Sequence, residues 1–202
     1  MNRLELIKSL EMRGVLKSPR LIEAFETVDR ADFVPEMLRY MAYDDTPLPI
    51  GAAQTISQPY TVVFMLELLQ PNAFDRVLDV GSGSGWTTAL LACVSKHVDG
   101  VERIEELVEL AKHNLSKYSF ENITLHQAKQ TLGLQGEYFD KILVSCAADE
   151  VPEPLLRQLN PGGTMVIPVN NSIMKVMKKS DGSIKMQEYP GFVFVPLIRD
   201  DF

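Results

Sequence analysis

The chain has 202 residues, of which 46% are hydrophobic and 23% charged, and it carries a formal net charge of −7. This length and composition suit one globular domain with a buried core. No apolar run approaches the roughly 20 residues of a membrane-spanning helix, and the polar N-terminus lacks the pattern of a secretory signal. The acidic balance argues against a broad nucleic-acid-binding surface. We therefore expect a cytoplasmic protein without a membrane or nucleic-acid partner.

The cysteine and histidine side chains give no metal signature. Cys93 and Cys146 lie far apart in apolar contexts, and we expect both to be buried, reduced thiols. The three histidines, His97, His113 and His126, form no cluster with metal-ligand spacing. No bound metal is expected.

Two helices are predicted before residue 30. Apolar residues recur at helical spacing from Leu4 to Leu10, and Gly14 ends this pattern. Ser18 and Pro19 are typical of the N-cap and first residue of a second helix. Both helices are expected to form an N-terminal extension to an α/β unit.

Residues 43–59 are predicted to form a long irregular loop, because their prolines and glycine disfavour regular structure. Loops of this length are uncommon in compact domains unless they are functional. Ser57 is the predicted N-cap of the next helix, over residues 59–69.

From Arg76 onward, strand and helix patterns alternate, which predicts a doubly wound, mainly parallel, Rossmann-like sheet with ligands beyond the carboxyl ends of its strands. The predicted strands are Val77–Val80, Val98–Val101, Ile123–Gln127, Lys141–Ser145 and Thr164–Val169, and the predicted helices Thr87–Ser95, Ile104–Tyr118 and Pro154–Gln158. Three further short strands, expected to be antiparallel, are Met174–Lys178, Ile184–Glu188 and Phe192–Leu197. No linker divides the chain, so we predict one domain over 1–202, comprising helices and loop (1–70), α/β core (71–169) and C-terminal strands (170–202).

The clearest chemical signal is the run Arg76-Val-Leu-Asp-Val-Gly-Ser-Gly-Ser-Gly-Trp86. A short apolar strand enters three alternate glycines, and a helix opens directly after them. Glycine lets a backbone approach a ligand closely, and a helix N-terminus offers unpaired N–H groups and a positive dipole end. The run therefore predicts a site for a nucleotide-like cofactor.

The glycine spacing separates two cofactors. Dinucleotide sites use Gly-x-Gly-x-x-Gly, whereas this chain has Gly-x-Gly-x-Gly. The following strand ends in Glu102, whose carboxylate can accept both hydroxyls of a ribose. Together these features resemble the S-adenosylmethionine (SAM) site of class I methyltransferases. The glycines alone leave SAM, NAD and a structural turn open, and Glu102 favours SAM.

Motifs along the whole chain resemble the protein-L-isoaspartate O-methyltransferase family. Asp45-Thr-Pro-Leu-Pro-Ile-Gly51 and Gln54-Thr-Ile-Ser-Gln-Pro59 are similar to its substrate-loop signature and are specific to it, whereas the glycine loop is shared by many methyltransferases. Further similar segments follow in the family's order, at Val77–Gly85, Val101–Ile104, Thr131–Gly133, Val151–Leu156, Leu159–Gly163 and Phe194–Leu197.

The resemblance implies methyl transfer from SAM to the α-carboxylate of isoaspartyl residues in damaged proteins or peptides, by an enzyme we expect to be a monomer. Ser57 matches the family's active-site serine and is the candidate catalytic residue. The implied substrate-binding residues are Pro49, Ile50, Thr55, Ile56 and Ser57. The implied cofactor-binding residues are Asp79, Gly81, Ser82, Gly83, Gly85, Glu102, Arg103 and Lys129.

The residue chemistry is compatible with this reaction. A carboxylate is already deprotonated near pH 7, so the attack needs no strong general base. Alignment and partial desolvation of the nucleophile must supply most of the rate. A serine hydroxyl at a helix N-cap suits the orientation of an anion, although Ser57 could also be a plain helix cap.

The chain departs from the family pattern in several places. Ala128-Lys-Gln130 stands where the family has Gly-Asp-Gly, so Lys129 either brings a base to the adenine edge or turns into solvent. Ala52-Ala53 replaces a glycine in the substrate loop, and residues 169–173 lack a glycine-rich turn. Trp86, where tyrosine is common, is interpreted as a packing residue. Two alternatives follow: a SAM-dependent O-methyltransferase acting on another peptide or small-molecule carboxylate, and a SAM-fold protein without catalysis.

Overall fold

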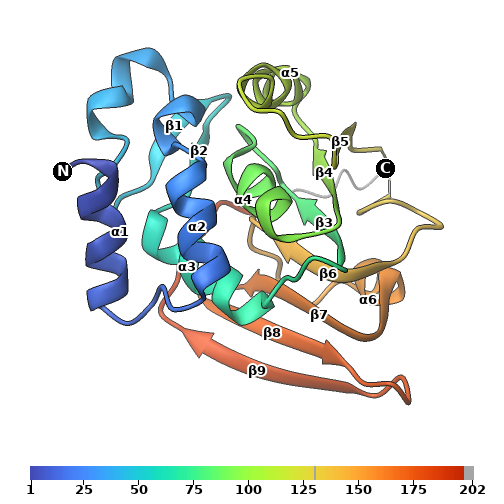
Figure 1. The fold of residues 1–202 in the computed structure, drawn as a ribbon. Helices are drawn as coiled ribbons and strands as arrows, with labels where there is room; N and C mark the ends of the chain where they lie inside the picture. The colour runs from blue at the N-terminus through green and yellow to red at the C-terminus, as the bar shows by residue number, and fades with distance from the viewer. Residues whose placement is uncertain (130, 198–202) are drawn as a thin grey trace.

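The computed structural model describes residues 1–129 and 131–197. Gln130, part of the Ala128-Lys-Gln130 departure, and residues 198–202 lie outside the described residues. A seven-stranded sheet with the order β5-β4-β3-β6-β7-β8-β9 forms the centre of the molecule (Figure 1). Its strands are β3 (Arg76–Val80), β4 (His97–Glu102), β5 (Ile123–Gln127), β6 (Phe139–Val144), β7 (Leu159–Val169), β8 (Ser172–Lys178) and β9 (Ile184–Pro190).

The first five strands pair in parallel, and β8 and β9 add antiparallel strands at one edge. This confirms the predicted doubly wound, mainly parallel sheet. The helices are α1 (Arg3–Met12), α2 (Pro19–Thr27), α3 (Pro59–Leu69), α4 (Trp86–Val94), α5 (Glu105–Leu115) and α6 (Glu153–Gln158), with short 3-10 helices η1 (Arg30–Phe33) and η2 (Glu36–Met41).

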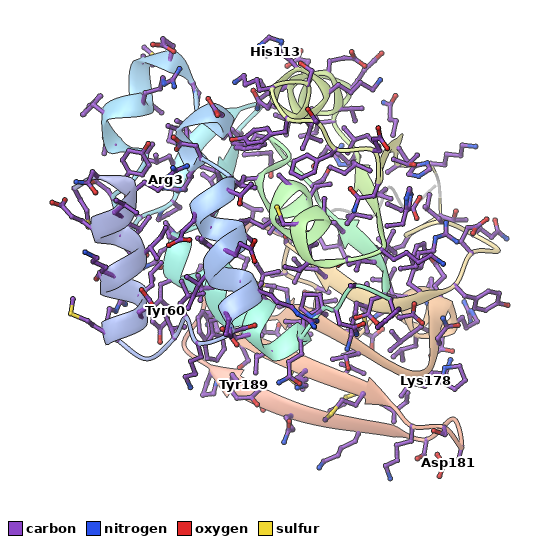
Figure 2. All side chains as sticks on the ribbon, in the orientation of Figure 1. Arg3, Tyr60, His113, Lys178, Asp181 and Tyr189 are labelled. Carbon is purple, nitrogen blue, oxygen red and sulfur yellow. The ribbon has the colours of Figure 1, made fainter. Side chains whose placement is uncertain are left out.

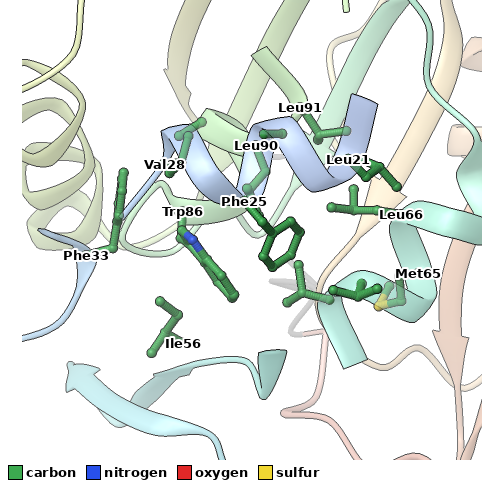
Figure 3. Packing of buried hydrophobic residues seen from close by; sticks show 14 of the residues in the cluster. Leu21, Phe25, Val28, Phe33, Ile56, Met65, Leu66, Trp86, Leu90 and Leu91 are labelled. Atoms are coloured by element: carbon green, nitrogen blue, oxygen red, sulfur yellow. The ribbon is translucent and has the colours of Figure 1, made fainter. Parts of the chain in front are cut away.

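The sheet has a separate hydrophobic core on each face, because successive strand residues point to opposite sides. Val77 belongs to the core shared with α1 to α5, and its neighbour Leu78 belongs to the other core. The first core is the larger, and Phe25 of α2 packs there edge-on against Trp86 of α4, with ring centroids 5.7 Å apart (Figure 3). The second core is covered mainly by α6, through Leu155, and by loops. The N-terminal extension therefore enlarges one face of the sheet.

Residues 43–59 are not the irregular loop that was predicted. They contain an antiparallel hairpin of β1 (Leu48–Gly51) and β2 (Gln54–Ile56), which we call the substrate hairpin. Its two turn residues, Ala52 and Ala53, both have positive φ angles, 48° and 55°. Positive φ at both turn positions is the geometry that matches the twist of paired strands, but it is normally signalled by Asn-Gly. Alanine gives no such signal, so the sequence pattern concealed the hairpin.

Three smaller predictions are also wrong. Residues 192–197 form no continuous strand; an isolated parallel bridge joins Pro196 to Ala147, through the hydrogen bonds that Ala147 makes with Val195 and Leu197. The N-cap of α3 is Gln58 instead of Ser57, since the backbone is still extended at Gln58 (ψ 133°). Cys93 is exposed on the outer side of α4, whereas Cys146 is partly buried; both are free thiols.

Candidate active site

A cavity of about 620 Å³ opens beyond the carboxyl ends of β3, β4 and β6, the position expected for ligands of this sheet type. Its size is typical of small-molecule sites. The substrate hairpin, the glycine loop, residues 128–129, residues within 131–138 and the segment 195–197 contribute to its walls. The two signature regions of the sequence, the glycine loop and the hairpin, therefore line the same cavity.

The glycines of the loop have two different tasks. Gly81 and Gly83 line the cavity with φ angles of 79° and 54°. A Cβ on Gly83 would lie 3.3 Å from Cδ1 of Ile50, so the substrate hairpin packs directly on this loop. Gly85 does not line the cavity; it is the N-cap of α4 (φ 92°), and a Cβ there would meet Ala111 of α5 at 3.3 Å. Gly85 thus permits close helix packing behind the site.

Glu102 ends β4 and holds the glycine loop in place. Its Oε2 accepts a hydrogen bond from the N–H of Gly83 at 3.0 Å. Its Oε1 accepts from the N–H groups of Arg103 and Ile104 at 2.7 and 3.0 Å. A carboxylate has about four acceptor sites, so Oε2 retains capacity for a ligand hydroxyl. Its position at the cavity wall fits the ribose role that the resemblance implies.

Asp79, predicted among the cofactor-binding residues, does not line the cavity. It is fully buried, and its Oδ2 accepts a hydrogen bond from the hydroxyl of Thr88 in α4 at 2.6 Å. Its Oδ1 has no hydrogen-bond partner in the described part of the chain. Burial raises the pKa of Asp79 to about 7. Asp79 lies in β3, whose residues 77–80 are all buried, and its side chain is directed into the protein and not into the cavity.

The cavity lining includes most of the predicted substrate residues: Ile50, Thr55, Ile56 and Ser57. Pro49 does not line it and is exposed in β1, although Thr55, its cross-strand partner in β2, does. The Ser57 side chain is partly buried at the cavity wall, and its backbone carbonyl accepts a hydrogen bond from Arg30. Strand β2 therefore runs along the cavity wall, with Gln54, Thr55 and Ile56 all lining it.

Three polar or charged residues complete the cofactor side. Arg103 and Lys129 line the cavity, and Lys129 is also exposed, so it stands at the rim between the cavity and solvent. The hydroxyl of Ser82 is buried and has no partner among the described residues. An unpaired buried hydroxyl in a cavity wall is costly unless a ligand satisfies it. Together, the glycine backbone, the Ser82 hydroxyl and the acceptor Glu102 form a set of polar groups that fits a SAM molecule.

Several lining residues were missed by reasoning from the sequence. Trp86 packs against Phe25 as expected (Figure 3), but it also lines the cavity. Pro196 and its neighbours form a wall because the N–H of Ala147 donates to the carbonyl of Val195 at 2.8 Å. The motif Phe194-Val-Pro-Leu197 was the available signal for this segment. Cys146 lines the cavity, and burial raises the pKa of its thiol to about 12, which agrees with a structural thiol.

Comparison with known proteins gives one consistent answer. Residues 1–201 match the family model described as protein-L-isoaspartate(D-aspartate) O-methyltransferase (PCMT). A protein-L-isoaspartate O-methyltransferase of Petrotoga mobilis is 43% identical over 98% of this chain and 96% of its own, and one of Methanopyrus kandleri is 44% identical over 98% and 92%. The fold is similar to that of a crystal structure named as a protein-L-isoaspartate O-methyltransferase of Plasmodium falciparum in complex with S-adenosyl-L-homocysteine. The TM-score is 0.86, with 26% identity over 99% of this chain and 100% of the other. The match spans the α/β core together with the hairpin and the C-terminal strands, and the chain therefore belongs to the protein-L-isoaspartate(D-aspartate) O-methyltransferase family.

Proposed function

We infer that this chain is a SAM-dependent carboxyl O-methyltransferase that methylates the α-carboxylate of L-isoaspartyl residues in damaged proteins or peptides. The observation that carries this conclusion is the contact of the family-specific hairpin with the glycine loop, at Ile50 and Gly83, which both line one cavity of suitable size. Family membership over nearly the whole chain supports it.

We propose that Gly81, Ser82 and Gly83 hold the methionine part of SAM and that Glu102 holds its ribose. Arg103 and Lys129 also line the cavity and are proposed to form the edge of the cofactor site. When bound, SAM supplies an electrophilic methyl group on a sulfonium centre. The uncapped first turn of α4 adds a positive dipole end to this side of the cavity.

Ser57 is proposed to orient the substrate carboxylate, with Thr55 and Ile56 forming the adjoining wall. The carboxylate is ionised at neutral pH and needs no base. The Cys146 thiol, with its raised pKa, is protonated at neutral pH and does not compete as a nucleophile. The residues of the hairpin therefore act by alignment and by excluding water from the nucleophile.

We also propose that the protein is a cytoplasmic monomer that binds neither nucleic acid nor membranes, which its net charge of −7 supports. Among the described residues, no helix combines the length and apolar character needed to cross a membrane. Within residues 1–129 and 131–197, no three His, Cys, Asp or Glu side chains are grouped so that they could hold a metal ion.

The test is methyl transfer from labelled SAM to a short isoaspartyl peptide, with the matched aspartyl peptide as control. Transfer to the isoaspartyl peptide alone, released by base as methanol, is the expected result. Binding of SAM without transfer would instead favour another carboxylate substrate. No stabilisation of the folded protein by millimolar SAM would indicate a SAM-fold protein that has lost its cofactor, because a ligand of the native state raises Tm by mass action.

A further inference from the structure

We propose that Arg30 is a positioning residue, which clasps the base of the substrate hairpin and thereby holds Ser57 at the cavity. The proposal rests on the function inferred above, because it concerns the same site. Arg30 opens η1, just after the two N-terminal helices, and belongs to none of the motifs that indicated site residues. Its relevance comes only from where the fold places its guanidinium.

The guanidinium donates to four backbone carbonyl oxygens. Nη1 donates to Ala42 and Asp44, at 2.8 and 3.2 Å. Nη2 donates to Thr46 at 2.9 Å and to Ser57 at 3.1 Å. Thr46 precedes the first strand of the hairpin and Ser57 follows the second. One nitrogen therefore ties together the two ends of the hairpin.

The clasp is buried. Arg30 is only 2% exposed, and its guanidinium lies over the Trp86 ring, 5.2 Å from the ring centroid. Burial lowers the pKa of Arg30 to about 10, so the group is still charged at neutral pH. Burying a charge against neutral carbonyls is expensive. The planar fork of arginine can reach several acceptors with fixed geometry, whereas a lysine ammonium cannot.

The hairpin is held at two separate points. Its face rests on the glycine loop through Ile50, and its base is held by Arg30. Loss of the base contact leaves Ile50 as a pivot, about which Ser57 can shift. Alignment of the carboxylate with the methyl group is sensitive to displacements on the order of 1 Å. The clasp should therefore affect use of the peptide more than binding of the cofactor.

The experiment compares Arg30→Lys and Arg30→Met with the wild-type full-length chain. Steady-state methyl transfer to an isoaspartyl peptide gives kcat and KM, and calorimetry gives the Kd of S-adenosylhomocysteine. Leu10→Ala is the matched control for general destabilisation, because Leu10 is fully buried in α1 and does not line the cavity. We expect kcat/KM for the peptide to fall about 10-fold in Arg30→Lys and about 100-fold in Arg30→Met, with the Kd within about threefold of wild type.

Backbone amide exchange of residues 46–57 provides a second readout that does not require activity. We expect faster exchange there in Arg30→Lys than in wild type and Leu10→Ala. Exchange as slow as in wild type would overturn the proposal, even if the wild-type chain proved to methylate no isoaspartyl peptide, which is a separate failure of the proposed function.

Three kinetic results would also overturn it. Wild-type activity of Arg30→Lys would mean that charge alone matters. An equal loss of cofactor affinity, or an equal loss of activity in Leu10→Ala at the same folded fraction, would mean that Arg30 only stabilises the fold. If Arg30→Met does not fold, Arg30→Lys decides the question.

Discussion

Two of the β-hairpins of this protein, β1–β2 and β8–β9, differ in what holds them together. The β8–β9 hairpin turns at Ser180-Asp-Gly182, where Gly182 supplies the positive φ of 84° and Asp181 accepts hydrogen bonds from Ser183. It projects at the edge of the molecule, with Asp181 at its tip (Figure 2). The substrate hairpin turns at Ala52-Ala53, residues that disfavour this geometry. The turn of the outer hairpin is thus specified by its own residues, whereas the turn of the substrate hairpin is not.

The contacts of the substrate hairpin with distant residues are the ones that build the site. Arg30 joins the two ends of the substrate hairpin, and Ile50 lies on the glycine loop. In β9 most side chains are exposed, and the hairpin is held by its backbone pairing with β8. We therefore expect substitutions at the substrate hairpin and its contacts to lower methyl-transfer activity. Matched substitutions in the turn of the β8–β9 hairpin should leave that activity unchanged.

The largest expected effect is at the contact between hairpin and glycine loop. In Gly83→Val the new Cβ would meet Ile50 at 3.3 Å, and valine disfavours the positive φ at this position. We expect methyl transfer to fall more than about 100-fold, through loss of cofactor affinity measured by calorimetry. The matched control is Gly182→Val, where nothing lies within 4 Å of the new Cβ. It should lose stability but keep full activity, and comparable activity loss in both variants would contradict the comparison.

Two aspartates should respond to pH in opposite directions. Burial raises the pKa of Asp79 to about 7, above its unfolded value of 3.8, so stability is lost as pH rises from 3.8 to about 7. Asp79→Asn should remove that loss and raise the stability of the ligand-free protein at pH 8 by on the order of 3 kcal/mol. Denaturant unfolding at pH 5 and pH 8 measures the difference, and an equal effect of the substitution at both values would exclude this origin.

Asp181, in the turn of the outer hairpin, provides the opposite case. Hydrogen bonds from Ser183 lower its pKa. Its contribution to stability is therefore present above the unfolded pKa and is lost as pH falls through the lower folded pKa. Asp181→Asn should thus change stability above pH 4 only, and only slightly because the group is exposed.

Removal of the Ser57 hydroxyl should affect the peptide and spare the cofactor. A hydrogen bond to a charged group contributes about 1.5–3 kcal/mol, so Ser57→Ala should lower kcat/KM for an isoaspartyl peptide by roughly 10- to 100-fold. Ser180→Ala, at the other hairpin, is the control and should match wild type. An unchanged kcat/KM in Ser57→Ala would limit Ser57 to a backbone role as an acceptor for Arg30.

The smallest expected effect concerns turn strain. Ala53→Gly removes a left-handed alanine that costs about 1–2 kcal/mol, partly offset by the greater freedom of glycine in the unfolded chain. A net gain of about 0.5–1 kcal/mol in unfolding free energy should follow. Gly182→Ala should lose about 1 kcal/mol by the same argument. A loss of stability in Ala53→Gly would show that the turn is not strained.

Most of the fold could be predicted because its signals are local. The helix over Pro59–Leu69 and the strand over Ile123–Gln127 have the predicted bounds, since their apolar periodicity or flanking turn residues specify them. The glycine loop and Glu102 were identified for the same reason, as a spacing rule within one βαβ unit. Three smaller predictions were wrong: Ser57 as the N-cap of α3, a strand over residues 192–197, and a buried Cys93. Each depends on the tertiary neighbours of the residue, which the periodicity of the sequence does not indicate.

The sequence by itself determined the sheet, the glycine loop and the family, because residue spacing and motif order carry that information. The tertiary structure alone decided that the substrate loop is a hairpin, that Asp79 points away from the cavity, and that Arg30 joins residues 46 and 57. These features depend on contacts between residues far apart along the chain. Their free energy comes from burial and hydrogen bonding in the folded protein, and it is large enough to override local preferences at Ala52 and Ala53.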